Sequence, residues 1–386
     1  MKYDAIIIGG GAAGLFCAAE AGKRGRRILL IEHNAQLGRK IVISGGGRCN
    51  FTNLNVKAEN FISSNPHFAK SALARYTPDD FIKLVKKHRI KFYEKKFGQL
   101  FCYERSYPIV EMLEDECAKG GVEVLTDCSV KKISRSESFE LETTKGKYSA
   151  KKIVVATGGL SFPKLGASDF GYNIAKQFGL KTTKLRPSLV ALRFSENLGF
   201  SKLAGISVDV SARIDDIVFR ENILFTHRGL SGPSVLQISN YWTPKKPILF
   251  DLLPDFDASE LIENNRTSAQ TVSKFLARYL PKRLAEEFTR RYFPNKPLKQ
   301  LSNDEIRGIS EMLNRWSVLF AATEGWDKAE VTLGGVDTDG ISSQTLEAKD
   351  VPGLYFIGEV LDVTGWLGGY NFQWAWSSGY ACGKAL

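Results

Sequence analysis

The residue types that build metal centres and disulfide frameworks are few and badly spaced in this sequence. The six cysteines form no C-x-x-C pair; they are Cys17, Cys49, Cys102, Cys117, Cys128 and Cys382. This spacing argues against a zinc ribbon, a thioredoxin-like motif and a disulfide scaffold. The four histidines stand far apart along the chain; they are His33, His67, His88 and His227. We therefore predict no metal site.

Long apolar runs are missing as well. No segment of the sequence reaches the length of a membrane span. The N-terminus does not resemble a secretory signal, because Asp4 interrupts the apolar stretch and the glycine run at 9–11 follows after only four apolar residues. We therefore expect a cytoplasmic protein without a membrane contact.

The size and composition indicate a multidomain globular protein. A chain of 386 residues and 42.9 kDa suits two or three domains. The content of 43% hydrophobic and 25% charged residues excludes a disordered or fibrous chain. The net charge of +11 is compatible with a nucleic-acid partner, but it is spread along the chain without a basic block. We interpret it as a solvated surface and expect no nucleic-acid partner.

Strand and helix patterns alternate in the first part of the chain. Residues 4–8 and 28–31 are short apolar runs that indicate buried strands, and the alanine-rich segment 12–24 between them indicates a helix. Further along, 122–133 and 139–148 are typical of antiparallel strands, and the second is expected to turn at 145–147. Another buried strand is predicted at 153–156, followed by Thr157 and two glycines.

The pattern changes after Arg186-Pro187 and changes back near residue 329. Alternation over 208–214 and the apolar run 248–250 indicate strands, and helical spacing begins at 257. A strand at 354–357 restores the earlier style. We predict an α/β protein with a discontinuous Rossmann-like domain, 1–187 and 329–386, and an inserted domain, 188–328. The insertion is predicted to be β-rich over 188–250 and helical over 251–328.

A dinucleotide fingerprint follows the first predicted strand. Gly9 to Gly14 fit G-x-G-x-x-G, a helix leaves the motif, and Glu32 closes the second strand 18 residues later. Gly9 is expected to make the tight turn, Gly11 to let the backbone approach a pyrophosphate, and Gly14 to let helix and strand pack. The Glu32 carboxylate is suited to accept hydrogen bonds from ribose hydroxyls.

The rest of the chain favours FAD over NAD as the resident nucleotide. The sequence contains no second G-x-G-x-x-G between a strand and a helix. Gly158 follows one buried strand, and Gly358-Glu359 follows another, distant one. A Rossmann domain that binds only a nicotinamide nucleotide would not need that distant segment to complete its site. We therefore predict FAD, with NAD(P)H as a transient donor.

Three long motifs resemble the BaiN/YhiN-type flavoproteins, also described as aminoacetone-oxidase-type FAD enzymes. The motifs are Leu37–Lys40 with Ser44–Asn53, Phe225–Pro233, and Gly334–Val336 with Gly353–Asp362 and Gly368–Ala375. The resemblance implies a glutathione-reductase-like FAD domain in two segments, with an insertion that holds a small β-barrel and a helical part. It also implies an oxidoreductase. The substrates described for the family, steroid-like compounds and an amino-ketone, do not identify the substrate of this chain.

Fingerprint, strand ends and family motifs together define the predicted cofactor contacts. They are Gly9, Gly11, Ala12, Ala13, Gly14, Glu32, Arg39, Lys40, Gly45, Gly46, Gly47, Arg48, Val130, Ala156, Thr157, Gly158, Gly358, Glu359, Asp362, Gly368, Gly369, Asn371 and Phe372. The pair Gly368-Gly369 is expected to start a helix whose N–H groups point at the flavin.

No catalytic acid or base stands out, and the candidates are Arg48, His227, Arg228 and Tyr370. For His227 and Arg228 a loop-stabilising role is an equal alternative. The favoured function is an FAD-dependent oxidoreductase that acts on a small organic substrate. A flavin-dependent RNA-modifying enzyme is the alternative, because basic residues decorate the helical segment 274–291. A flavin-binding redox sensor or carrier without a substrate is the third reading.

Overall fold

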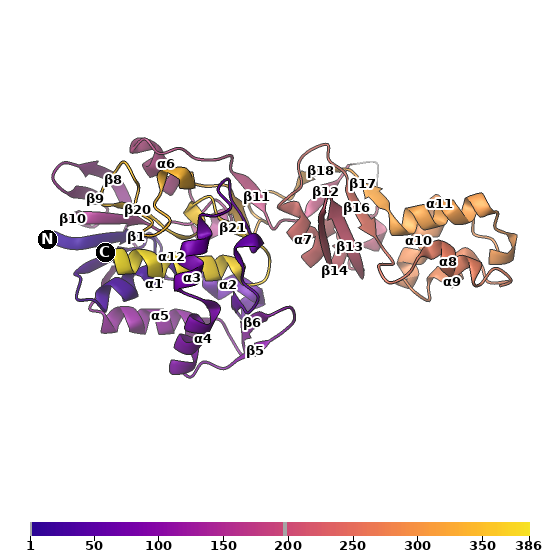
Figure 1. Ribbon diagram of the computed structural model, residues 1–386, viewed down its shortest axis with the longest axis horizontal. Helices are drawn as coiled ribbons and strands as arrows, with labels where there is room; N and C mark the ends of the chain where they lie inside the picture. Colours follow the sequence, from indigo (N-terminus) through magenta and orange to yellow (C-terminus); the bar gives the residue numbers. More distant parts are fainter. Residues whose placement is uncertain (1, 196–198) are drawn as a thin grey trace. The chain divides into compact units, whose positions relative to one another are not determined.

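Figure 1 shows the computed structural model, which describes residues 2–195 and 199–386. The chain divides into two compact units. We call Met1–Pro187 with Val331–Leu386 the Rossmann unit, and Ser188–Glu330 the inserted unit. The division predicted from the sequence, at 187 and 329, lies close to these boundaries.

The Rossmann unit is built on a seven-stranded sheet in the order β7-β2-β1-β10-β9-β8, with β20 beside β10. Strands β7, β2, β1, β10 and β20 run parallel, and β9 and β8 are antiparallel to β10. The strands are β1 (Lys2–Ile8), β2 (Ile28–Ile31), β7 (Glu123–Leu125), β8 (Val130–Arg135), β9 (Phe139–Thr143), β10 (Gly146–Val155) and β20 (Leu354–Phe356). Every residue of β2 is buried, as expected for a parallel sheet covered on both faces.

Two expected strands differ from the structure. Segment 122–133 is not one strand, because Glu123–Leu125 joins the parallel sheet as β7 and Val130–Arg135 forms the antiparallel edge β8. The strand expected at 153–156 is the end of β10, which begins at Gly146. Alternation of apolar and polar residues identifies strands, but it does not show where one strand ends and the next, with a different partner, begins.

Smaller sheets and seven helices complete the Rossmann unit. Three small sheets pair β3 (Asn50–Asn53), β6 (Gln99–Cys102) and β5 (Phe92–Glu94); β4 (Phe61–Ile62) and β21 (Thr364–Gly365); and β11 (Arg186–Ser188) and β19 (Val331–Leu333). The helices are α1 (Ala12–Gly22), α2 (Arg39–Gly47), α3 (Ala69–Arg75), α4 (Pro78–Lys87), α5 (Tyr107–Lys119), α6 (Phe170–Gln177) and α12 (Tyr370–Ala385). Among the described residues, no helix is long and apolar enough to cross a bilayer.

Helix α12 packs along α1, as Figure 1 shows. Glycines on α12 permit the close approach. A Cβ at Gly379 would lie 2.8 Å from the carbonyl oxygen of Ala13, and one at Gly383 would lie 2.8 Å from the Cβ of Glu20. The C-terminal segment is therefore locked onto the helix that follows the glycine-rich loop.

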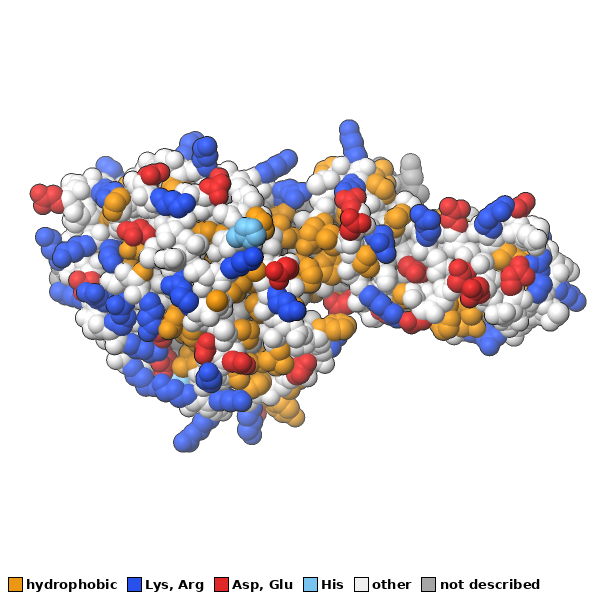
Figure 2. Space-filling view, in the orientation of Figure 1, with side chains coloured by type: hydrophobic (Ala, Val, Ile, Leu, Met, Phe, Trp, Pro, Cys, Tyr) orange, Lys and Arg blue, Asp and Glu red, His pale blue; other side chains and the backbone are white. Residues whose placement is uncertain are grey.

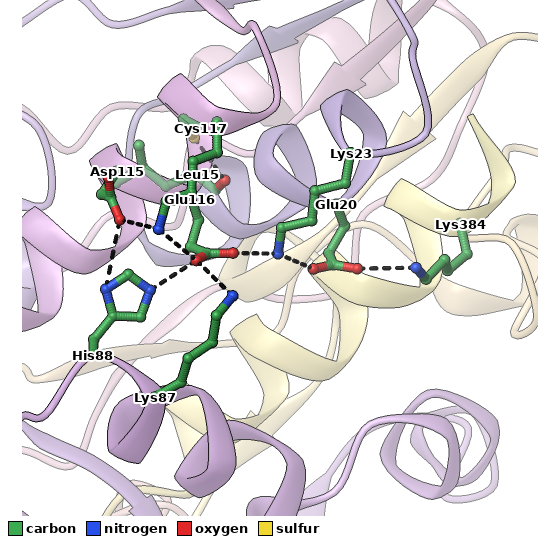
Figure 3. Close-up of polar contacts among 10 residues, drawn as sticks. Leu15, Glu20, Lys23, Lys87, His88, Asp115, Glu116, Cys117 and Lys384 are labelled. Atoms are coloured by element: carbon green, nitrogen blue, oxygen red, sulfur yellow. Dashed lines mark hydrogen bonds and ion pairs between the residues drawn. The ribbon is translucent and has the colours of Figure 1, made fainter.

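The buried carboxylate of Glu116 on α5 connects this helix with the C-terminal ends of α1 and α4 (Figure 3). The Glu116 side chain, only 1% exposed, contacts the ammonium group of Lys23 at 2.6 Å and the His88 ring at 2.7 Å. His88, Asp115 and Glu116 are close enough to hold a metal ion. However, Lys23 and Lys87 already contact the carboxylate, and their positive charges oppose a cation.

The inserted unit contains a seven-stranded antiparallel sheet in the order β17-β16-β13-β14-β15-β12-β18. Its strands are β12 (Leu192–Phe194), β13 (Ser207–Ile214), β14 (Ile217–Phe225), β15 (Gly229–Ser231), β16 (Ile248–Asp251), β17 (Trp316–Val318) and β18 (Phe320–Thr323). The two edge strands of this sheet, β17 and β18, are separated in the chain by Leu319 alone. The sheet must therefore curve so that its two edges approach each other, as in the predicted barrel. The helices are α7 (Pro233–Ser239), α8 (Ala258–Glu263), α9 (Val272–Leu276), α10 (Lys282–Tyr292) and α11 (Asn303–Asn314).

The helical part of the insertion is shorter than predicted. The segment 251–328 was expected to be helical, but the last helix ends at Asn314 and β17 and β18 return to the sheet. Trp316 explains the return, because its ring lies in the aromatic core, 5.1 Å from Phe288 and 5.6 Å from Phe200. The length of the two strands is near the lower limit that periodicity can detect.

Candidate cofactor-binding site

The carboxyl ends of β1, β10 and β20 bring three distant glycine segments to one edge of the sheet. A Cβ at Gly9 would lie 2.4 Å from the carbonyl oxygen of Ala156. One at Gly358 would lie 2.9 Å from the Cβ of Ala13. Since ligands of open α/β sheets bind beyond the carboxyl ends of the strands, this edge is the candidate site.

The N-terminus of α1 forms the centre of this edge. Gly11 is the N-cap, no side chain caps the helix, and its first turn holds no acidic residue. A Cβ at Gly11 would meet no atom within 4 Å, so protein packing does not require glycine there. At Gly14, by contrast, a Cβ would lie 1.9 Å from the carbonyl oxygen of Gly9. The open space before free N–H groups, which include those of Ala12 and Ala13, fits an anionic phosphate.

Glu32 lies at the end of β2 beside this loop. Its carboxylate, largely buried, accepts a hydrogen bond from the Gly10 N–H at 2.7 Å and another from the Asn34 N–H at 2.8 Å. The Arg39 guanidinium donates to the Asn34 side chain at 2.8 Å. The Glu32 carbonyl accepts from the Cys128 N–H, two residues before Val130. Asn34 thus links Arg39 to Glu32, and two backbone N–H groups hold the Glu32 carboxylate in place.

The glycine run 45–47 ends a helix that the sequence did not predict. Helix α2 includes Gly45 and Gly46 in left-handed conformations, and Gly47 follows with φ of +83°. A Cβ at Gly45 would lie 2.8 Å from the Phe101 ring, whereas Gly46 and Gly47 face open space. Consecutive left-handed glycines turn backbone N–H groups outward, which suits a ligand with anionic or carbonyl oxygens.

Lys40 of α2 and Glu359 after β20 meet in a polar cluster that also includes Ser161, which follows β10. The Lys40 ammonium donates to Glu359 Oε2 at 2.8 Å and to Ser161 Oγ at 2.7 Å. The other carboxylate oxygen of Glu359 accepts from Ser161 Oγ at 2.9 Å and from the Thr332 N–H at 3.0 Å. Ser161 and Thr332 were missed by the sequence analysis. Ser161 lies shortly after the predicted strand end at Thr157–Gly158, and this position in the sequence could have indicated that it belongs to the site.

The segment 358–375, which we call the closing segment, leads into α12 as predicted. Packing against other parts of the protein is one reason why its Gly368 and Gly369 must be glycine. Gly368 and Gly369 have φ of +113° and +97°. A Cβ at Gly369 would lie 2.4 Å from the carbonyl oxygen of Thr52, and one at Gly368 would lie 2.9 Å from the Gln99 side chain. Helix α12 has no side-chain cap and no acid in its first turn. Its N-terminus is therefore suited to negative charge, as α1 is.

Three predicted contacts have side chains engaged elsewhere. The Asn371 amide bonds the backbone of Gly365 at 2.8 and 2.9 Å. The buried Asp362 accepts from the N–H and the hydroxyl of Ser64 at 2.9 and 2.6 Å. Phe372 stacks on Trp376. These side chains order the closing segment, so a cofactor contact there depends on the backbone.

Thr157 differs from these side chains. Its hydroxyl is buried and has no hydrogen-bond partner. An unpaired buried hydroxyl is costly. This one faces helix α6, since a Cβ at Gly171 would lie 2.4 Å from it.

The catalytic candidates fall into both units. Arg48 is exposed beside the glycine run and donates to the Tyr93 hydroxyl at 3.3 Å. Tyr370 is buried against Phe61, and burial raises its pKa. His227 and Arg228 are exposed on the inserted unit, where Arg228 lies 3.6 Å from Glu324. That contact fits the loop-stabilising alternative for Arg228.

Comparison with known proteins assigns the chain to a family. The family described as HI0933-like protein Rossmann domain matches residues 3–385. A protein of Escherichia coli (strain K12) named ribosomal RNA dihydrouridine synthase is 52% identical over 100% of this chain and 98% of its own. A protein of Haemophilus influenzae with the same name is 47% identical over 99% of this chain and 98% of its own.

More distant proteins share the architecture. The 3-dehydro-bile acid delta(4,6)-reductase of Clostridium scindens is 31% identical over 98% of both chains. A solved structure of 3-ketosteroid-delta4-(5alpha)-dehydrogenase from Rhodococcus jostii covers 99% of this chain and 97% of its own, with a TM-score of 0.50 and 14% identity. These matches confirm the predicted Rossmann-type FAD-binding fold and a flavin-dependent oxidoreductase. The chain belongs to the HI0933-like family of Rossmann-domain proteins.

Proposed function

We propose that this chain is a flavin-dependent dihydrouridine synthase that acts on ribosomal RNA. The observation that carries the proposal is 52% identity over the whole chain to a protein of that name. The proposal replaces two expectations from the sequence, a small organic substrate and no nucleic-acid partner. It adopts the alternative of an RNA-modifying flavoenzyme, for which the net charge of +11 is an advantage.

The reaction saturates the C5=C6 bond of a uracil ring by adding one hydride and one proton. FAD, when bound and reduced by a nicotinamide donor that we also propose, would supply the hydride, and water would supply the proton. In our proposal the α1 N-terminus and Gly11 hold the pyrophosphate, and Glu32 holds the adenosine ribose. The Lys40–Glu359 cluster ties helix α2 to the segments that follow β10 and β20. Tyr370, which lies at the start of α12 with its ring against Phe61, is the candidate to orient the base.

The test uses ribosomal RNA from a strain that lacks this gene. The purified holoprotein is incubated without oxygen with this RNA and NADH or NADPH, and nucleosides are analysed by mass spectrometry. We expect dihydrouridine at a defined position. Gly11→Asp is the matched control, because the new side chain meets open space but its charge opposes the pyrophosphate. This variant should fold, lack FAD and form no product.

Absence of dihydrouridine while the donor reduces the flavin would overturn the proposal. Reduction of an unsaturated steroid ketone under the same conditions would support the second candidate, which rests on the 31% identical bile-acid reductase.

A further inference from the structure

The small sheet β3–β6–β5 of the Rossmann unit has two different faces. Phe92 on β5 lies 5.6 Å from Phe51 on β3, and Phe51 contacts the core residue Phe81. On the opposite face, Tyr93 stacks on its cross-strand partner Phe101 at 5.9 Å. Because side chains alternate along a strand, this second face carries every other residue of β5 and β6. We call it the hairpin face.

Large aromatic side chains are exposed on the hairpin face and at its tip. Tyr103 is 63% exposed, and its ring lies 6.1 Å from that of Tyr93. At the turn between β5 and β6, Phe97 is 62% exposed and has a φ of +52°. The Asn53 and Asn55 amides donate to its carbonyl at 3.1 and 3.3 Å. An exposed aromatic ring on a left-handed turn that two side-chain hydrogen bonds hold in place is a candidate contact residue.

Basic residues outnumber acidic ones in the segment that carries these rings. Segment 89–105 has five basic residues and two acidic ones, and one of the acids, Glu94, accepts the Gly98 N–H inside the turn. Lys95 lies 5.4 Å from the centre of the Phe101 ring. Figure 2 shows hydrophobic and basic side chains, with some acidic ones among them, at the lower edge of this unit, over the strands labelled β5 and β6 in Figure 1. Aromatic rings among cations form a surface for stacked bases with a phosphate backbone.

The hairpin face continues into the proposed cofactor site. Phe101 contacts the position of Gly45 in the glycine run, and Arg48 donates to the Tyr93 hydroxyl. The Asn53 amide that holds Phe97 also donates to the carbonyl of Gly368 at 2.9 Å. A polymer on this face therefore passes beside the segments that we expect around the flavin.

The basic helix of the inserted unit is a weaker candidate. Arg290 and Arg291 of α10 both contact Glu287, at 2.7 and 2.5 Å, and Arg283 bonds the carbonyl of Lys202. These cations serve the unit's own structure.

We propose that the hairpin face binds single-stranded RNA, with Tyr103 and Phe97 stacking on bases that flank the target uridine. The inference rests on the proposed function, since it names where that substrate is held. A protein partner is the competing occupant. Lysine is depleted in the cores of protein interfaces, whereas Lys91 and Lys95 lie on this face, Lys91 opposite Tyr103. Unpaired bases that stack on aromatic side chains are the usual mode of single-stranded RNA recognition.

The test measures RNA binding separately from catalysis. A fluorescein-labelled oligouridylate is titrated with holoprotein, and binding is followed by fluorescence anisotropy. We expect Tyr103→Ala and Phe97→Ala each to weaken binding about tenfold. Lys95→Ala should lower the slope of log affinity against log salt by about 0.7, which corresponds to one phosphate contact, whereas Tyr103→Ala should leave the slope unchanged.

Phe256→Ala and Lys282→Ala are the matched controls, because they remove an exposed ring and an exposed charge from the inserted unit. Both should bind within about twofold of the wild type. All variants should keep their far-UV circular dichroism and flavin content, since the altered side chains are exposed.

The outcomes separate this inference from the proposed function. If the wild type does not bind the oligouridylate, or if Tyr103→Ala and Phe97→Ala bind it as the wild type does, the hairpin face is not the RNA site, even when dihydrouridine is formed. If these variants change only the oligomeric state, the face is a protein contact and the inference is also overturned. If they lose RNA binding while the wild type forms no dihydrouridine, the RNA site stands and the proposed reaction fails.

Discussion

The ammonium group of Lys40 lies 2.8 Å from a carboxylate oxygen of Glu359, a residue 319 positions later in the chain. The pair ties α2 to the turn after β20, and Ser161 joins it from the end of β10. Three segments that are proposed to surround one cofactor thus share one carboxylate. The pair is partly exposed, at 31% and 19% of the two side chains, so the bonds to the shared carboxylate matter more than the isolated ion pair.

Glu359→Ala should destabilise the protein more than Lys40→Met. The first change removes the acceptor for Lys40, Ser161 and Thr332, whereas the second removes one donor. We expect a loss of about 2–3 kcal/mol for Glu359→Ala and about 1 kcal/mol for Lys40→Met. Urea unfolding of the apoprotein and the holoprotein measures both. A larger loss in the holoprotein would support a cofactor contact, and equal losses would limit Glu359 to a structural role.

Glu32→Ala should weaken FAD binding by about 1–3 kcal/mol, because it removes the acceptor proposed for the ribose hydroxyls. Titration of deflavinated protein with FAD measures the change. His33→Ala is the control, since the half-exposed His33 ring touches the same carboxylate at 3.1 Å but is not a proposed ligand. An affinity for FAD that Glu32→Ala leaves unchanged would rule out Glu32 as the ribose ligand.

Gly369→Ala should lower the free energy of unfolding and the flavin content more than Gly25→Ala does. Both glycines have left-handed backbones, but a Cβ at Gly25 meets open space and one at Gly369 would lie 2.4 Å from the carbonyl oxygen of Thr52. Backbone strain alone costs about 1–2 kcal/mol in each variant, and the contact with Thr52 adds to it at Gly369. Equal unfolding free energies and equal flavin content in the two variants would contradict this explanation.

Glu116→Gln should destabilise the protein at neutral pH and lose its effect in acid. Burial raises the pKa of Glu116, but hydrogen bonds from Lys23 and His88 outweigh burial and lower it from 4.5 to about 2. The carboxylate therefore contributes stability above pH 4.5, roughly 3 kcal/mol, and this contribution disappears as the pH falls toward 2. Urea unfolding at neutral pH and at about pH 3 compares the variant with the wild type. Glu111→Gln, on the exposed side of α5, should change neither measurement; a constant deficit for Glu116→Gln at both pH values would argue against the ionic origin.

Local patterns determined the Rossmann part of this protein. The apolar runs at 4–8 and 28–31 became β1 and β2, and the glycines at 9–14 lie where the fingerprint requires them. Such features can be predicted because each depends on neighbours in the chain: strand periodicity, helix capping, and the steric demand of a turn. Thr77 and Asp80 form a capping box at the start of α4, a contact between residues only three positions apart.

Tertiary structure decided what no local pattern contains. The sequence did not predict that Glu359 would bind Lys40 and Ser161, that Thr52 rather than a ligand would crowd Gly369, or that Trp316 would draw the chain back into the sheet of the inserted unit. Each of these contacts joins residues far apart in the sequence, and its partner is known only when the strands are ordered. The exposed rings of Phe97 and Tyr103 belong to the same class, because aromatic residues beside short strands are expected in the core, and only the folded sheet shows that these two are exposed to water.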